Sequence, residues 1–306
     1  MSGYVKGRRK SKSPDDFYGM NIAGHFVPSE MIITSMLVSL YLLFLIGGAI
    51  GGGDDSLILE IFSFIMFAIL AYAVRTSLKR MEPFTKVIDA FLILSTAPLV
   101  ISLGKMAGIL SPAAFEGITG IMYYNLAYLV LSAMLIAMLL FFEKDRMSDI
   151  FIKAGNMLES IKVGVAGLLI CGVIFIAAQL FLYGGGLSFL SASPDTAIAV
   201  LLLSAAGAIS AEIWFRGLLL SRLLDVVEKD AAIVIQAGVF AVFEALIAFT
   251  LTQDMIITIF ALVAAAGLGY YWGRVTVKND SIIGPILFHT GFYTLIVLPV
   301  LAGTIA

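Results

Sequence analysis

A succession of long apolar stretches, separated by short polar segments, restricts what this chain can fold into more than any other feature. A helix needs about 17 or more residues to cross the hydrocarbon core of a bilayer, and we predict about nine spans of that kind. Their positions are 31–50, 57–75, 87–104, 118–142, 163–183, 196–224, 231–252, 256–273 and 281–302. Because a bilayer offers no water to backbone polar groups, the expected fold class is all-α, a polytopic bundle of membrane helices.

The composition supports the same class. Hydrophobic residues make up 60% of the chain and charged residues 13%, with a mean hydropathy of +1.03. A soluble domain has roughly 45–50% apolar and about 25% charged residues. Cys171 is the single cysteine, so no disulfide can form within the chain. The first apolar span has no small-residue cleavage site, so we expect an integral, multi-pass membrane protein without a cleaved signal peptide.

The basic residues are concentrated in alternate connections between the spans. Lys and Arg recur in the N-terminal tail, between residues 75 and 86, between 144 and 162, between 222 and 229, and between 274 and 278. The remaining connections carry Lys105 and several aspartates. The positive-inside rule therefore predicts a cytoplasmic N-terminus and, with nine spans, a C-terminus on the outer side.

The chain is predicted to have three parts. They are a basic cytoplasmic tail at residues 1–30, four accessory spans within 31–158, and a five-span bundle at 159–306. The connection at 143–162 carries apolar residues at helical spacing, which predicts a helix lying on the membrane surface. The basic tail favours contact with anionic membrane lipid, and no part of the sequence indicates a nucleic-acid partner.

Three ionisable side chains fall inside apolar spans in the last third of the chain, namely Glu212, Glu244 and His289. Arg216 follows Glu212 by four residues, so these two side chains meet on one helix face. At 1.5 Å per residue, Glu212 lies about 18 Å and His289 about 12 Å from the basic ends of their spans, so the groups can converge. Such residues are costly in a membrane unless they pair or form a site, so we expect one buried polar site that opens to the cytoplasm.

Less specific interpretations of these residues stay open. Glu212 and Arg216 can neutralise each other and only hold helices together, and His289 can be a packing residue with satisfied hydrogen bonds. Two carboxylates and one histidine are also an adequate ligand set for zinc or iron. The expected cofactor is therefore either none or a single divalent metal held by Glu212, Glu244 and His289.

Three short motifs carry a resemblance to a known family. Residues 211–216 read Ala-Glu-Ile-Trp-Phe-Arg, residues 240–244 read Phe-Ala-Val-Phe-Glu, and residues 289–293 read His-Thr-Gly-Phe-Tyr. They resemble, in order and separation, Glu-Glu-x-x-x-Arg, Phe-x-x-x-His and His-x-x-x-Asn of the CAAX-processing endopeptidases and bacteriocin-related membrane proteases (the CPBP or Abi family). The resemblance covers roughly residues 160–306 and includes the run from Gly267 to Arg274. It implies a membrane protease whose first glutamate and second-motif histidine activate water, and whose last histidine and asparagine stabilise the oxyanion.

The chain departs from this pattern where the family's chemistry is carried. Ala211 stands at the first glutamate, Glu244 at the histidine and Tyr293 at the asparagine. Alanine cannot accept a proton, and general-base catalysis contributes roughly 10²–10⁴ in rate. The positions that keep the pattern are Glu212, Arg216, Phe240 and His289.

Three functions from different classes follow as hypotheses. The leading one is a catalytically degenerate relative that binds another membrane protein or a lipidated or transmembrane peptide, as a binding or scaffold subunit. The second is an active endopeptidase that uses Glu244 and His289, with Tyr293 donating to the oxyanion. The third is a proton- or ion-coupled transporter built on the same carboxylates, although no internal repeat supports it.

Overall fold

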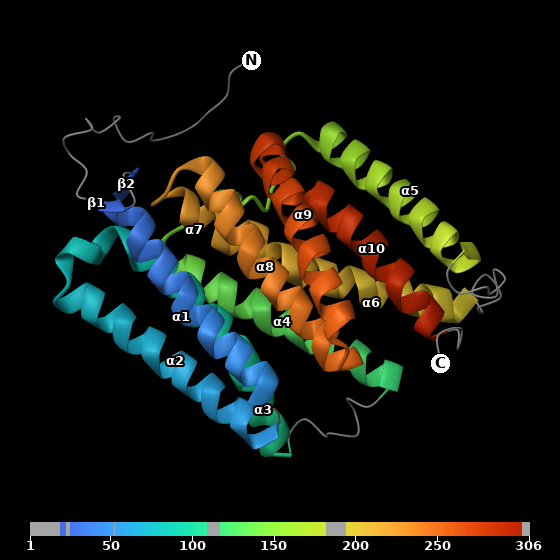
Figure 1. The fold of residues 1–306 in the computed structure, drawn as a ribbon, viewed down its shortest axis with the longest axis horizontal. Coiled ribbons are helices and arrows are strands. Elements are labelled where there is room, and N and C mark those ends of the chain that lie inside the picture. The colour runs from blue at the N-terminus through green and yellow to red at the C-terminus, as the bar shows by residue number, and fades with distance from the viewer. Residues whose placement is uncertain (1–18, 23–24, 52, 109–116, 182–193, 302–306) are drawn as a thin grey trace.

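The structure is a computed structural model that describes residues 19–22, 25–51, 53–108, 117–181 and 194–301 (Figure 1). The elements in chain order are β1 (Gly19–Ile22), β2 (His25–Pro28), α1 (Ser29–Gly51), α2 (Gly53–Thr76), the 3-10 helix η2 (Lys79–Phe84), α3 (Thr85–Met106), α4 (Gly117–Glu143), the 3-10 helix η4 (Met147–Ile150), α5 (Met157–Phe181), α6 (Pro194–Glu212), the π-helix η6 (Ile213–Leu219), α7 (Leu220–Leu224), α8 (Lys229–Thr252), α9 (Met255–Asn279) and α10 (Ile283–Leu301).

The helical class is confirmed, and each predicted span coincides with a long helix or, for 196–224, with the run from α6 through η6 to α7. Within the described residues, seven helices are long and apolar enough to cross a membrane; they comprise α1 to α4, the run from α6 to α7, α8 and α9. The chain is therefore an integral membrane protein. Nine crossings and the sidedness of the two termini stay predictions.

Part of the predicted tail forms a short antiparallel hairpin that the sequence analysis did not anticipate. Strands β1 and β2 pair with Gly19 opposite Pro28 and Ile22 opposite His25. Helix α1 begins at Ser29, directly after β2. The basic residues on which the lipid-contact prediction depends, Lys6 to Lys12, lie outside the described residues, as does the predicted 184–195 connection.

The predicted surface helix at 143–162 is wrong. Residues 157–162 are the first turns of α5, and between α4 and α5 only a single 3-10 turn, η4, forms. Phe151 ends η4 in a left-handed conformation with φ of 60°. The following residues are tied to the connection between α9 and α10, because Ile282 N–H donates to the Phe151 carbonyl and Asn156 N–H to the Asn279 carbonyl. Of the apolar residues at this spacing, Ile150 is buried against the bundle, whereas Met157 and Leu158 are exposed at the start of α5.

The helices pack closely where small residues allow it. Helix α10 lies between α5 and α6, and α8 lies against both α1 and α9. A Cβ added at Gly167 of α5 would lie 2.2 Å from the ring of Phe288, and one added at Gly164 would lie 2.5 Å from Leu287 Cβ. Small residues at helix interfaces allow two helices to approach closely in a membrane, so close packing of complementary surfaces holds α5 on α10.

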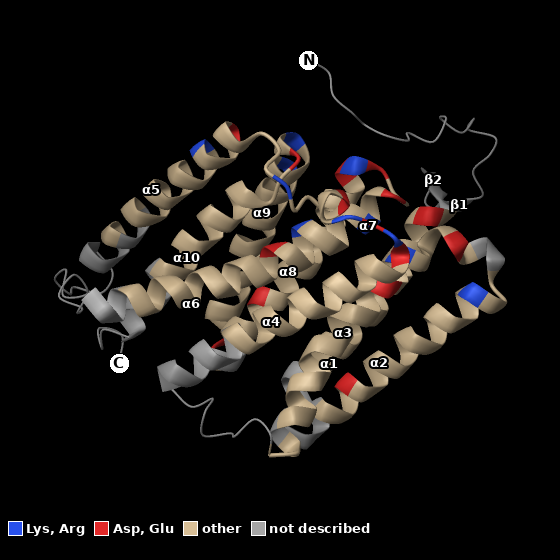
Figure 2. Cartoon of the chain, turned by 180° about the vertical axis from the view of Figure 1, so that it is seen from behind, with Lys and Arg blue, Asp and Glu red and all other residues tan. Residues whose placement is uncertain are grey.

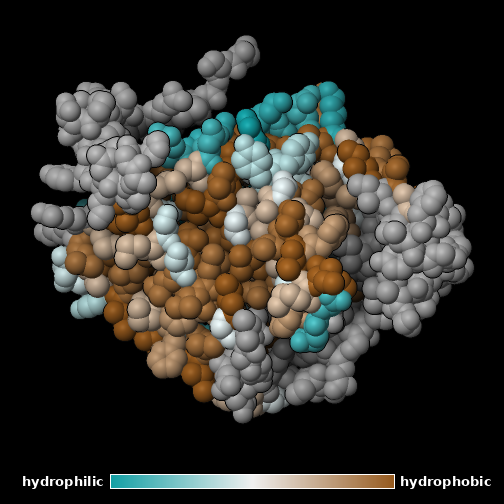
Figure 3. Space-filling model, viewed as in Figure 1, coloured by the Kyte–Doolittle hydropathy of each residue, from teal (hydrophilic) through white to brown (hydrophobic). Residues whose placement is uncertain are grey.

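Charge and apolar surface are arranged as in a membrane protein. Lys and Arg gather along one end of the bundle (Figure 2). The face of the molecule shown in Figure 3 is mostly apolar. Hydrophilic residues border it at the end of the bundle where α5 begins. Large apolar side chains of the helices are strongly exposed, for example Phe141 at 79% and Ile256 at 80%. Exposure on this scale is expected where lipid replaces water as the solvent.

Candidate functional site

The site begins at an irregular turn in the helix that carries the first motif. Helix α6 ends at Glu212 and continues as the π-helix η6, in which Leu220 N–H donates to the carbonyl of Phe215, five residues earlier. Such widened turns are rare and occur frequently at functional sites. Glu212 and Arg216 are both fully buried, and Arg216 Nη1 donates to Glu212 Oε1 at 2.9 Å. The structure thus brings together the pair expected from its four-residue spacing.

His289 reaches the same carboxylate from α10. Its Nδ1 lies 2.8 Å from Glu212 Oε1, and the imidazole is 1% exposed. One carboxylate oxygen therefore faces both a guanidinium and an imidazole. The ion pair and the hydrogen bond together lower the cost of burying Glu212 at membrane depth.

Glu244 lies on the other side of His289. The Nε2 of His289 is 4.0 Å from Glu244 Oε1, which accepts a hydrogen bond of 2.5 Å from the hydroxyl of Tyr293. The side chain of Glu244 is 13% exposed, more than those of Glu212 and His289. The three ionisable residues singled out in the sequence thus form one cluster, in which an imidazole stands between two carboxylates.

Aromatic rings enclose this cluster. Arg216 Cζ lies 3.9 Å from the centre of the Phe240 ring and 5.0 Å from that of Trp272. The Trp272 ring is 4.7 Å from the imidazole of His289. A guanidinium over aromatic faces is stabilised by cation–π attraction, most strongly when it is shielded from water.

Trp272 was not identified as a site residue from the sequence. It lies within the run from Gly267 to Arg274. Its position three residues after Gly269 puts both residues on one face of α9, and this spacing could have pointed to it. A Cβ at Gly269 would lie 3.0 Å from Phe240 Cδ1, so this glycine lets α9 approach α8 closely enough to place the indole over Arg216.

The cluster does not fit a metal. Among the residues that the structure describes, no group of three or more His, Cys, Asp or Glu side chains is placed to hold a metal ion. The reason is local: His289 Nδ1 and Arg216 already engage Glu212 Oε1, and a guanidinium beside the carboxylate repels a second cation. Zinc ligands need to converge at about 2.0–2.3 Å from one point, and these side chains are engaged with one another instead.

A second polar assembly lies at the basic end of the bundle. Asp145 Oδ2 accepts from Lys86 of α3 at 2.6 Å and pairs with Arg222 of α7 at 2.7 Å, while Arg222 also contacts Glu143 at 2.6 Å. Burial of the Asp145 carboxyl raises its pKa, but the hydrogen bond from Lys86 and the charge of Arg222 outweigh this and hold the pKa below its ordinary value. These ion pairs join the accessory helices to α7.

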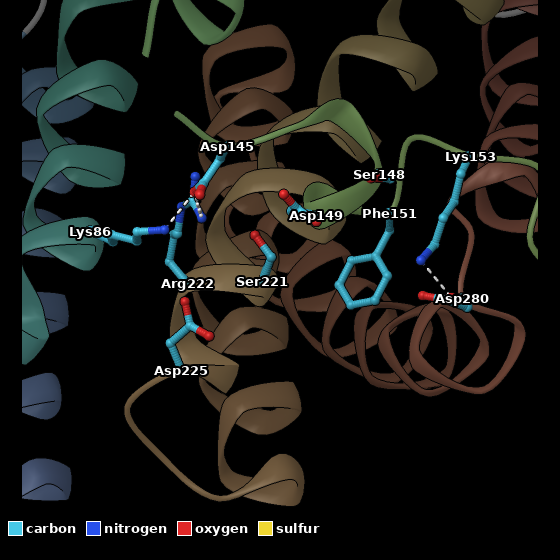
Figure 4. A pocket seen from close by; sticks show the side chains of 10 residues that line it. All are labelled: Lys86, Asp145, Ser148, Asp149, Phe151, Lys153, Ser221, Arg222, Asp225 and Asp280. Carbon is cyan, nitrogen blue, oxygen red and sulfur yellow. Dashed lines mark hydrogen bonds and ion pairs between the residues drawn. The ribbon is translucent and has the colours of Figure 1, made fainter. Parts of the chain in front are cut away.

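The same assembly lines a pocket of about 430 Å³ (Figure 4). Figure 4 shows Lys153 and Asp280 at the opposite wall, joined by an ion pair of 2.5 Å. The pocket's charged side chains are largely paired with each other. It differs from the expected opening to Glu212, since neither Glu212, Glu244 nor His289 lines it.

Comparison with known proteins adds the family. Residues 193–295 match the family model of the Rce1-like type II CAAX prenyl endopeptidases. This segment is similar to that family, and we call it the Rce1-like domain. It extends from α6 into α10 and contains all three motifs, so the resemblance seen in the sequence is confirmed for this part of the chain. No curated protein and no solved structure matches the chain.

The match is shorter than the resemblance predicted from the sequence. Helix α5 lies outside the matched residues, although it packs on α10 of the Rce1-like domain. The accessory helices α1 to α4 also lie outside the match. They are joined to the Rce1-like domain by the Arg222 ion pairs and by Trp214 Nε1, which donates to Ser132 of α4 at 2.7 Å.

Proposed function

We propose that the Rce1-like domain is catalytically degenerate and acts as a membrane-embedded binding or scaffold subunit. Its ligand is a lipidated or transmembrane peptide, or another membrane protein. The observation that carries this proposal is the burial and pairing of Glu212, the one glutamate of the first motif that this chain keeps. Glu212 is fully buried and its Oε1 is engaged by both Arg216 and His289, while its neighbour Ala211 offers no carboxylate.

A general base must have a free lone pair within hydrogen-bond reach of water at the scissile bond. Glu212 Oε1 is shared by a guanidinium and an imidazole, and the Arg216 guanidinium is itself stacked against Phe240 and Trp272. Glu212 Oε2 has no partner among the described residues, but it is fully buried and does not reach water at a scissile bond. These contacts support a structural role for Glu212. Loss of general-base assistance alone removes roughly 10²–10⁴ in rate, which is enough to make cleavage negligible.

A second candidate function is an active endopeptidase with Glu244 as the base. The observation in its favour is the arrangement of Glu244, His289 and Tyr293, in which Glu244 is the most exposed carboxylate of the cluster. Glu244 has a hydrogen-bond donor of its own in Tyr293, and a tyrosine hydroxyl can serve an oxyanion.

One experiment separates the two functions. The purified protein is placed in lipid nanodiscs with a farnesylated CAAX peptide, and peptide products are measured by mass spectrometry over time. The degenerate domain leaves the peptide intact, at the level of empty nanodiscs. Cleavage that is abolished by Glu244→Gln would overturn the proposal in favour of the endopeptidase.

The double variant Ala211→Glu/Glu244→His serves as the positive arm of this experiment. It restores the two groups that activate water in the family to which the domain is similar. Cleavage by this variant and not by the unmodified protein assigns the loss of activity to these two positions.

A further inference from the structure

Five fully buried residues where η6, α8 and α9 meet carry side-chain polar atoms that lack a hydrogen-bond partner in the described part of the chain. The donors are on Arg216 (Nε and Nη2), Gln236 (Nε2) and Trp272 (Nε1). The acceptors are Glu212 Oε2 and Gln236 Oε1, and Thr276 Oγ1 can serve as either. All five residues are 0% exposed, so neither bulk water nor lipid reaches these atoms.

These atoms lie on facing surfaces of the three helices. Arg216 is stacked against Trp272, with Cζ 5.0 Å from the ring centre. Gln236 of α8 packs against Gly273, the residue of α9 that follows Trp272. A Cβ added at Gly273 would lie 3.1 Å from Gln236 Oε1. Thr276 follows Trp272 by one helical turn and so shares its face of α9. The group therefore extends along the contact of α8 with α9, from Arg216 towards the helix ends that carry Lys229 and Lys278.

A buried polar group without a partner is strongly unfavourable, and more than nine in ten buried polar groups in proteins are hydrogen-bonded. Leaving all of these atoms unpaired would cost as much free energy as a typical domain gains by folding. A ligand that satisfies them must both donate and accept hydrogen bonds, must carry no net charge beside the Glu212–Arg216 pair, and must be small enough for a closed space. Water meets all three conditions.

We propose that a few water molecules are bound between η6, α8 and α9, and that they form an internal hydrated site linking the Glu212–Arg216 pair to Gln236 and Thr276. A buried water makes about three hydrogen bonds, so two or three molecules satisfy this group of atoms. The site goes beyond the proposed function, since it lies on the Gln236 side of Arg216 and not at Glu244, and it exists whether or not the domain cleaves a peptide.

The two tryptophans of the chain provide a matched test. Both indoles are buried, Trp272 at 0% and Trp214 at 1%. Trp214 Nε1 donates to Ser132 at 2.7 Å, whereas Trp272 Nε1 has no hydrogen-bond partner among the residues that the structure describes. The protein is labelled with ¹⁵N at the indoles, placed in nanodiscs and examined by NMR for magnetisation transfer between each indole N–H and water. The Trp214→Phe variant assigns the two signals.

The hydrated site predicts a water cross-peak for Trp272 and none for Trp214. Cross-peaks at neither indole would show that the contact of α8 with α9 is dry and would overturn the proposal. Cross-peaks at both would attribute the signal to general opening of the bundle and would overturn it as well.

Apolar replacement gives an independent readout of the same site. Thr276→Val and Gln236→Leu remove the proposed water contacts and are expected to lower Tm by about 2–4 °C each. Thr96→Val is the control, because Thr96 Oγ1 donates to the Leu92 carbonyl at 2.7 Å. The change in Tm of this variant measures the loss of one hydrogen bond made within the protein. A rise in Tm for both Thr276→Val and Gln236→Leu would show that their polar atoms are truly unpaired, and would contradict bound water.

Discussion

The carboxylate of Glu212 and the imidazole of His289 are 77 positions apart in the chain and meet at 2.8 Å in the centre of the Rce1-like domain. The contact joins the end of α6 to α10 at the point where Arg216 of η6 also binds Glu212. It converts the remaining glutamate of the first motif into part of a buried polar network.

Removal of Arg216 is expected to destabilise the protein more than removal of the whole pair. Arg216→Ala leaves Glu212 buried with a single partner, and breaking a buried ion pair costs about 3–5 kcal/mol. The double variant Glu212→Gln/Arg216→Gln keeps hydrogen-bonding side chains and removes both charges, so it is expected to be milder. Thermal unfolding in detergent measures both.

The control for this prediction is Lys162→Ala. Lys162 and Glu159 form an ion pair on α5 whose side chains are 61% and 42% exposed, and such surface pairs contribute about 0–1 kcal/mol. A double variant that is clearly less stable than Arg216→Ala would contradict the account of the pair.

Helix α5 is expected to depend on Gly167 for its place in the bundle. A Cβ there would lie 2.2 Å from the Phe288 ring, and overpacking of this kind costs about 1–3 kcal/mol or more. Gly167→Leu should therefore lower Tm or yield. A Cβ added at Gly172 of the same helix has no described atom within 4 Å, so Gly172→Leu should behave like the unmodified protein. Equal loss of stability in both variants would contradict the packing of α5 on α10.

Much of this arrangement could be predicted from particular residues. The spacing of Glu212 and Arg216 predicted their contact, and the depths of Glu212, Glu244 and His289 in their spans predicted a common level. These inferences succeed because helical rise and the cost of buried charge are local and general rules. They act on any sequence of this kind, whatever its tertiary packing.

Other features could not be predicted, because tertiary contacts decide them. The π-turn of η6 leaves no residue pattern that distinguishes it from α-helix. The segment after Ile150 was predicted as a helix, but its backbone bonds to the α9–α10 connection instead, which competes successfully with local helix formation. The position of Trp272 over Arg216 depends on how closely α9 approaches α8 at Gly269.

The predicted sidedness can be tested at the two ends of α3. Ser77→Cys and Ala107→Cys place thiols at exposed residues before and after this helix. The positive-inside rule predicts that an impermeant thiol reagent labels Ser77→Cys from the cytoplasmic side and Ala107→Cys from the opposite side. The unmodified protein is the background control, since Cys171 is buried. Labelling of both cysteines from one side would refute the predicted topology.

The ion pairs of Asp145 are expected to make stability depend on acid pH. The folded-state pKa of Asp145 lies below its ordinary value of 3.8, so its stabilising contribution is present above that value and is lost as the pH falls through the folded-state pKa. Comparison of Tm against pH for the unmodified protein and for Asp145→Asn isolates this contribution. The difference between the two proteins should shrink as the pH drops below about 3.8. A difference that is the same at pH 3 and pH 7 would argue against the ion pairs.

The mass of a bound peptide tests most directly whether the Rce1-like domain binds without cleaving. A farnesylated CAAX peptide is incubated with the protein in nanodiscs, unbound peptide is removed, and the retained peptide is released and weighed by mass spectrometry. We expect the peptide to be retained above the level of empty nanodiscs and to have its full original mass. A retained or released peptide that has lost its last three residues would contradict it, and so would retention no greater than that of empty nanodiscs.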